Sequence, residues 1–119
     1  MFALFFQVAL GGAIGAVARY MIGLLVIFPF GTMAVNVVGS FLMGVAWVMM
    51  TERGLERWMP GVLTGLLGGF TTFSAFSLDT FRLVDDGRIL AAGGYVLATV
   101  LLSVLALFVA IALTRFAQV

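Results

Sequence analysis

The sequence predicts an all-α integral membrane protein of four transmembrane helices, which form a single domain over residues 1–119. Of the 119 residues, 64% are hydrophobic and 9% are charged, and the mean hydropathy is +1.26. A soluble domain has about 45–50% apolar and about 25% charged residues, so it could not bury this apolar surplus. A transmembrane helix needs about 20 mostly apolar residues. The chain offers four such spans, at about 2–27, 32–50, 60–81 and 89–113.

Short polar or helix-breaking segments separate the four spans. The first span ends before Phe28-Pro29-Phe30-Gly31, where Pro29 lacks an amide hydrogen and favours a turn. A charged connection of residues 51–58 follows the second span and ends in Trp58, a residue typical of the headgroup region. Pro60 suits the first turn of the third span, and residues 82–88 form the polar turn before the fourth.

The third span is predicted to be broken near its middle. Paired glycines, Gly68 and Gly69, are followed by hydroxyl residues at every second or third position as far as Ser77. Non-helical backbone within a membrane persists only where protein or a bound species satisfies its carbonyls. Unwound carbonyls can coordinate a small cation such as sodium. Two such breaks meeting at a dimer axis would allow one central ion to bridge the subunits.

The charged residues favour neither enzyme chemistry nor one membrane orientation. The chain has no Cys and no His, which excludes thiol and Ser-His catalysis, and we expect no enzyme. A net charge of +1 gives no electrostatic reason for nucleic-acid binding. Cationic residues normally gather on the cytoplasmic side, but each side here receives three: Arg53, Arg57 and Arg115 against Arg19, Arg82 and Arg88. This balance favours insertion in both orientations and an antiparallel homodimer; a weak bias that counting does not reveal is the alternative.

Two polar stripes follow the second and fourth spans. Residues spaced by four lie on one helix face, and the stripes are formed by Thr32, Asn36 and Ser40, and by Tyr95, Thr99 and Ser103. Such neutral donors could line a path for a small anion without trapping it, as full charges would. A single Ser or Thr more often bonds a carbonyl of its own helix, whereas Asn36, between two valines, favours a functional role.

Aromatic, charged and small residues within the spans complete the candidate set. Phe73 and Phe76 share a helix face, and their ring edges could favour an anion, although packing is the commoner role of such a pair. Arg19 could extend to the membrane surface or raise the anion potential at a pore entrance. Asp79 could pair with Arg82 or couple protons to transport. Small residues at four-residue spacing predict tight helix contacts, mostly within one subunit: Gly11 and Gly15; Ser40 and Gly44; Gly61, Gly65 and Gly69.

The segment Gly68-Gly69-Phe70-Thr71-Thr72-Phe73-Ser74-Ala75-Phe76-Ser77 closely resembles the GGFTTFSTF signature of the Fluc (CrcB) fluoride channels. The Gly-rich first span through Arg19-Tyr20, and the second span around Asn36, resemble the family's first two helices, so the resemblance covers nearly the whole chain. It implies an antiparallel homodimer in the plasma (inner) membrane with two fluoride pores, each lined by both subunits, that export fluoride passively.

The resemblance also implies roles for individual residues. Phe73, Phe76 and Asn36 match pore residues of the family, and Gly68 and Thr71 match the backbone carbonyl ligands of a structural sodium ion at the dimer interface. The remaining matches are Tyr95, Thr99 and Ser103 on the fourth-helix polar track, Thr32 in a vestibule, and Arg19 in the first helix. The signature usually has Thr at Ala75 and Glu at Asp79, so the roles of these two positions stay open.

Two other functions are alternatives. A four-helix, dual-topology multidrug or cation exporter needs an intramembrane carboxylate in its first helix, where this chain has Arg19 and no acid. A non-transporting assembly subunit would suit the glycine spacing, but it leaves the polar stripes and the broken helix unexplained. The residues alone predict a small-ion channel or transporter, and fluoride follows from the resemblance.

Overall fold

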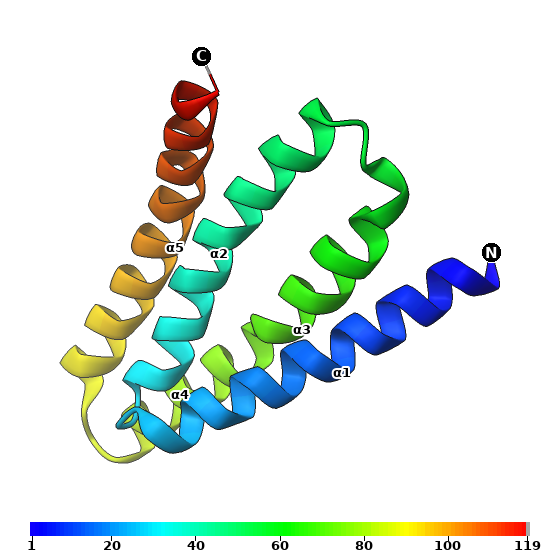
Figure 1. The fold of residues 1–119 in the computed structure, drawn as a ribbon. Helices are drawn as coiled ribbons and strands as arrows, with labels where there is room; N and C mark the ends of the chain where they lie inside the picture. Colours follow the sequence, from blue (N-terminus) through cyan, green and yellow to red (C-terminus); the bar gives the residue numbers. More distant parts are fainter. Residues whose placement is uncertain (119) are drawn as a thin grey trace.

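The structure, a computed structural model, describes residues 1–118, and this part of the chain is helical and contains no strand (Figure 1). Its elements are α1 (Phe2–Leu25), α2 (Phe30–Glu52), η1 (Glu56–Trp58), η2 (Pro60–Leu67), α3 (Gly68–Phe70), α4 (Phe73–Asp85) and α5 (Ile89–Ala117). Four helical stretches are long and apolar enough to cross a membrane: α1, α2, Glu56–Asp85 and α5. The predicted all-α membrane fold is confirmed, and the chain is a multi-pass membrane protein.

The helices end at different residues from the predicted spans. Helix α1 stops at Leu25, two residues early, because Val26 is extended ahead of the Pro29 turn. Helices α2, α4 and α5 continue to Glu52, Asp85 and Ala117, past the apolar stretches. Polar residues at these ends can be solvated by headgroups and water, so the helix does not have to stop where the hydrocarbon does.

Glycines allow backbones to approach closely where the helices pair. Helix α1 packs along η2 and α3, and α2 packs along α5 (Figure 1). A Cβ at Gly69 would lie 2.8 Å from the carbonyl oxygen of Gly12, and one at Gly44 would lie 2.7 Å from that of Leu107. Such distances leave no room for a side chain, so these glycines mediate helix contacts within one chain, as predicted.

The third span is broken, and the break lies two residues after the glycine pair. Gly68 and Gly69 are helical, whereas Thr71 (ψ 161°) and Thr72 (φ −156°, ψ 123°) are extended between α3 and α4. Gly69 is needed where α1 crosses, and polar side chains near Thr72 replace the helical hydrogen bonds there. The prediction of a broken helix is confirmed, but its position differs from the predicted one.

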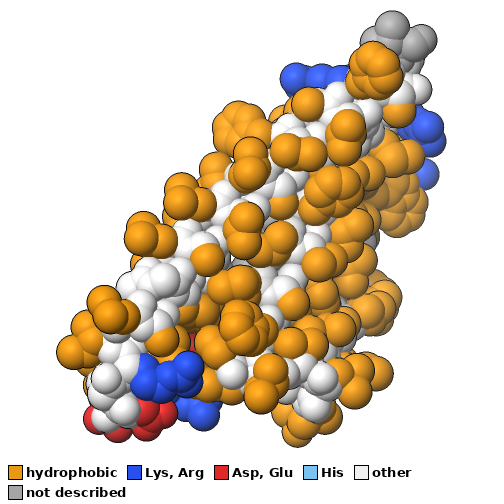
Figure 2. Space-filling view, turned by 90° about the vertical axis from the view of Figure 1, so that its left-hand side faces the viewer, with side chains coloured by type: hydrophobic (Ala, Val, Ile, Leu, Met, Phe, Trp, Pro, Cys, Tyr) orange, Lys and Arg blue, Asp and Glu red, His pale blue; other side chains and the backbone are white. Residues whose placement is uncertain are grey.

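The surface matches a membrane environment. Hydrophobic side chains cover the face seen in Figure 2, and charged side chains gather towards the two ends of the molecule. One small buried cluster is formed by Phe76, Leu83, Ala92 and Tyr95, and other buried apolar residues, such as Val35, Val48 and Ala110, lie elsewhere along the helices. Most large apolar side chains are exposed, which a soluble protein would not tolerate.

Candidate functional site

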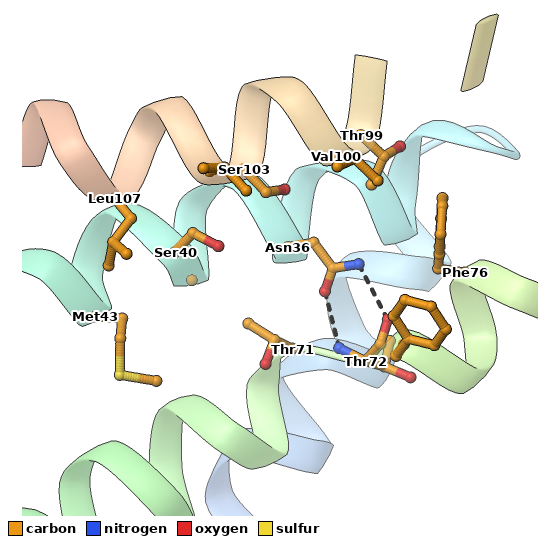
Figure 3. Close-up of a pocket in the computed structure, with 13 residues that line it drawn as sticks. Asn36, Ser40, Met43, Thr71, Thr72, Phe76, Thr99, Val100, Ser103 and Leu107 are labelled. Carbon is orange, nitrogen blue, oxygen red and sulfur yellow. Dashed lines mark hydrogen bonds between the residues drawn. The ribbon is translucent and has the colours of Figure 1, made fainter. Parts of the chain in front are cut away.

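A pocket of about 390 Å³ opens between α2, α5 and the broken part of the third span (Figure 3). It contains six of the eight predicted fluoride-path residues: Asn36, Ser40, Phe73, Phe76, Thr99 and Ser103. The other lining residues are Gly39, Met43, Thr71, Thr72, Val100, Val104 and Leu107, so no charged side chain lines it. The structure thus brings the two polar stripes and the phenylalanine pair together, while their part in ion passage stays a prediction.

Asn36 is fixed by two hydrogen bonds to the backbone of Thr72 (Figure 3). Its Nδ2 donates to the Thr72 carbonyl oxygen at 3.0 Å, and the Thr72 N–H donates to its Oδ1 at 2.8 Å. The amide therefore satisfies both backbone groups of an extended residue inside the membrane span. An amide nitrogen carries two hydrogens, so one N–H of Asn36 remains for another acceptor.

The hydroxyl groups of Thr99 and Ser103 are buried without a hydrogen-bond partner among the described residues. Other hydroxyls of the chain follow the common pattern and donate to carbonyls of their own helix, namely those of Thr51, Ser77, Thr80 and Thr114. Leaving a buried polar group unpaired costs about 1–3 kcal/mol, so such groups call for an explanation. Both hydroxyls belong to pocket residues, where a bound species could pair with them.

Phe73 and Phe76 line the same pocket and meet edge to face. Their ring centroids are 5.5 Å apart with an interplanar angle of 66°. Phe76 is buried and also contacts the ring of Tyr95 at 5.4 Å, whereas 77% of Phe73 is exposed. Phe73 therefore presents an exposed aromatic ring at the margin of the pocket.

Thr32 and Tyr95, the other two predicted path residues, lie outside this pocket. Thr32 lines a second pocket of about 280 Å³ together with Arg19 and Thr72. Tyr95 is buried behind Phe76, and its hydroxyl donates to Asp79 Oδ2 at 3.3 Å. The Tyr95 side chain therefore supports the site from behind.

Asp79 is buried and takes part in the ion pair that its spacing predicted. Its Oδ1 lies 3.8 Å from Arg82 Nη1, and the Arg82 guanidinium also lies 4.2 Å from the centre of the Phe28 ring. A third pocket, of about 210 Å³, is lined in part by Thr32, Asp79 and Arg82.

Arg19 forms a hydrogen bond to the backbone of the third span. Its Nε donates to the carbonyl oxygen of Gly69 at 3.1 Å, so it attaches α1 to the helix just before the break. Because Arg19 also lines the second pocket, a role at a pore entrance stays a prediction.

The carbonyls of Gly68 and Thr71 have lost the N–H groups that would pair with them in a continuous helix. In a continuous helix these carbonyls would accept from the N–H groups of Thr72 and Ala75. The Thr72 N–H donates to Asn36 instead, and the Ala75 N–H donates to Thr72 Oγ1 at 3.1 Å. Within residues 1–118 no cluster of acidic side chains could hold a metal. Backbone oxygens freed in this way fit a small hard cation.

The central structural role of Thr72 was not predicted from the sequence. Its backbone binds Asn36, and its hydroxyl caps the first turn of α4. A hydroxyl residue three positions before Ala75 is an N-cap signal, which could have located the break at Thr72. The buried, unpaired Oε1 of Gln7 was also not foreseen; it faces Gly61 in the contact between α1 and η2.

Comparison with known proteins identifies the family. The model of the family described as "CrcB-like protein, Camphor Resistance (CrcB)" matches residues 6–111. Proteins named fluoride-specific ion channel FluC are similar over most of their length. That of Paracoccus denitrificans is 47% identical over 116 residues, covering 93% of this chain and 94% of the relative. Those of Cereibacter sphaeroides (strain ATCC 17029) and Saccharophagus degradans are 51% and 45% identical, covering 92% and 94% of this chain and 92% and 90% of the relatives. The chain therefore belongs to the CrcB-like family.

Proposed function

We propose that this chain is a fluoride-selective ion channel of the plasma (inner) membrane that lowers cytoplasmic fluoride by passive export. The relatives named above are fluoride-specific ion channels. The observation that carries the proposal is the pair of unpartnered hydroxyls of Thr99 and Ser103, which lie in one uncharged pocket with Asn36. Such groups are hydrogen-bond donors available to an anion.

Selectivity follows from the size of the ion and the nature of these donors. A buried anion loses most of its hydration at a severe cost, which only close hydrogen bonds can offset. The free N–H of Asn36 and the two hydroxyls offer such bonds to the smallest halide, and the edges of Phe73 and Phe76 add weak positive potential. Because no full positive charge lines the pocket, the ion is bound weakly enough to leave, as conduction requires.

The functional unit is an antiparallel homodimer with two pores, each lined by both subunits. The three-to-three distribution of arginines gives insertion no preferred direction. One chain alone leaves Phe73 largely exposed beside the pocket, and a second copy could enclose it. Closed two-fold pairs are the commonest oligomers.

A structural sodium ion would be held at the dimer interface by the backbone carbonyls of Gly68 and Thr71. This proposal is supported by the helical donors of both carbonyls, which hydrogen-bond elsewhere, and by the exposure of Gly68 on the single chain. When bound, sodium would supply the positive charge that joins two broken helices. Arg19, Thr32 and Asp79 act at the pore entrances, and Tyr95 holds Asp79 from behind.

The alternative, a proton-coupled multidrug or cation exporter, is not favoured. Its chemistry needs a carboxylate in the first helix, and α1 contains no acidic residue. Asp79, the one buried carboxylate among the described residues, is already engaged by Arg82 and Tyr95. Neutral hydrogen-bond donors and aromatic rings line the pocket, so we assign it conduction and not catalysis.

Ion efflux from liposomes that contain the purified protein tests this function. We expect fluoride efflux that needs no proton gradient, with chloride retained under the same conditions. Efflux that depends on a proton gradient would favour a transporter. Equal efflux of chloride, or none of fluoride, would contradict the proposed function.

A further inference from the structure

At the break, the side chains of Asn36 and Thr72 accept backbone N–H groups that would donate to carbonyls in a continuous helix. In an unbroken helix, the N–H of residue i donates to the carbonyl four residues earlier. The Thr72 N–H donates to Asn36 Oδ1 at 2.8 Å, and the Ala75 N–H donates to Thr72 Oγ1 at 3.1 Å. Each side chain thus takes the donor of one particular carbonyl, Gly68 in the first case and Thr71 in the second.

Several other backbone groups around the break are engaged by side chains or by the helix. The Gly69 carbonyl accepts from Arg19 Nε at 3.1 Å, and the Thr72 carbonyl accepts from Asn36 Nδ2 at 3.0 Å. The Thr71 N–H and hydroxyl both donate to the Leu67 carbonyl, at 3.1 and 3.0 Å. These bonds hold the extended segment from two sides, from α1 through Arg19 and from α2 through Asn36.

We propose that Asn36 and Thr72 are positioning residues of the sodium site, because they keep the carbonyls of Gly68 and Thr71 free of helical hydrogen bonds and available to the ion. The inference rests on the sodium ion of the proposed function and adds what makes its ligands available. Neither side chain is itself proposed as a ligand of the ion. Each acts by capturing an N–H that would otherwise compete with it.

The same arrangement links the sodium site to the pocket. The Asn36 amide lines the pocket and is oriented by its two bonds to Thr72. If the break rewound, the Thr72 N–H would return to Gly68, and the amide would lose the acceptor bond that orients it. A sodium ion held by the Gly68 carbonyl would oppose this rewinding and would stabilise the donor geometry of Asn36. Such coupling between two ligands is reciprocal.

Thermal unfolding of the purified protein in fluoride-free buffer tests the inference, with sodium compared against choline. A ligand that binds only the folded state raises its stability with concentration, so wild-type protein should show a Tm that rises with sodium. The informative quantity is this sodium-dependent rise, because a merely structural defect lowers the Tm equally in both cations.

Four variants give the comparison. Asn36→Leu removes both bonds to Thr72, and Thr72→Val removes the acceptor for the Ala75 N–H, whereas Thr72→Ser keeps it. Thr80→Val is the matched control, because its hydroxyl donates only to the Phe76 carbonyl within α4. We expect the sodium concentration for the half-maximal rise to increase about tenfold in Thr72→Val, the factor that corresponds to about 1.4 kcal/mol, and to stay unchanged in Thr72→Ser and Thr80→Val. Asn36→Leu, where it folds, should show no rise at all.

The results that overturn the inference differ from those that overturn the channel function. A wild-type Tm that does not respond to sodium, or a Thr72→Val response equal to that of Thr80→Val, would refute the positioning role. Neither result depends on fluoride, and liposome efflux measures the channel function separately.

Discussion

Removing the Thr99 hydroxyl should lower fluoride flux without lowering the stability of the protein. Thr99 Oγ1 is buried and has no hydrogen-bond partner among the described residues, so Thr99→Val keeps the shape of the side chain and removes an unsatisfied group. The free energy of unfolding should therefore stay the same or rise, by up to about 1–3 kcal/mol, the cost of an unpaired buried polar group. A substitution that improves the fold and impairs function indicates a functional site.

The expected loss of flux follows from the same hydroxyl. A hydrogen bond to a charged partner contributes about 1.5–3 kcal/mol. If this bond is made at the barrier to permeation, its loss slows passage roughly 10-fold to 100-fold, because each 1.36 kcal/mol is a factor of ten in rate. Fluoride efflux from liposomes measures the rate, and thermal unfolding in detergent measures the stability.

Thr114→Val is the matched control for Thr99→Val. Thr114 lies on the same helix, but its hydroxyl donates to the Ala110 carbonyl at 2.6 Å, and it does not line the pocket. This control should keep wild-type flux. If Thr99→Val conducts at the wild-type rate, or if it loses flux only in proportion to a loss of stability, the assignment of Thr99 to the ion path is refuted.

Three further sets of substitutions test other parts of the structure. Phe73→Ile and Phe76→Ile should both reduce fluoride efflux because they remove ring edges. Only Phe76→Ile should lower the Tm in detergent, since Phe76 is buried and 77% of Phe73 is exposed. Unchanged flux in both variants would contradict the aromatic role. Gly69→Ala should lower stability by about 1–3 kcal/mol, because its Cβ would lie 2.8 Å from the Gly12 carbonyl oxygen. Gly93→Ala, with no atom within 4 Å of its Cβ, should be neutral or stabilising by about 0.5–1 kcal/mol. Equal Tm values for the two variants would refute the close contact with α1. Asp79→Asn keeps an acceptor for Tyr95 but removes the charge that pairs with Arg82. Fluoride efflux should remain independent of a proton gradient in this variant. A wild-type efflux that is driven by such a gradient and abolished in Asp79→Asn would favour coupled transport.

The four spans were predictable because their cause is local. Apolar length and the turn-forming residues between the spans determine where the chain can cross a membrane, and neither requires knowledge of tertiary contacts. The glycine spacing likewise predicted tight helix contacts, because residues spaced by four share a face whatever the helix packs against. It did not identify the partners, which the structure shows to be α1 and the third span. The helix ends shifted by a few residues because polar residues are tolerated beyond the hydrocarbon.

The position of the break was not predictable from the glycines alone. Gly68 and Gly69 have a high intrinsic tendency to leave a helix, yet they remain helical, since Gly69 allows α1 to pack closely. The chain opens at Thr71 and Thr72, because Asn36 from α2 replaces the missing backbone hydrogen bonds. That partner lies 36 residues away in the sequence, so periodicity within one helix could not have identified it. The same limit applies to Arg19, whose partner Gly69 lies 50 residues away.

An asparagine at position 36 fits two requirements that no apolar or acidic residue of similar size fits together. The Thr72 backbone presents one donor and one acceptor, and the Asn amide answers both through Oδ1 and one N–H. Its second N–H is left for the pocket, where a permeating anion needs a donor. An ionised Asp could accept from the Thr72 N–H, but it would face the Thr72 carbonyl without a donor and would repel an anion. Leu would satisfy neither backbone group. If Asn36 serves both the break and the path, Asn36→Asp should abolish fluoride flux while retaining part of the sodium-dependent rise in Tm, whereas Asn36→Leu should lose both. Equal losses of the sodium response in these two variants would show that the acceptor bond to Thr72 is not what keeps the Gly68 carbonyl free.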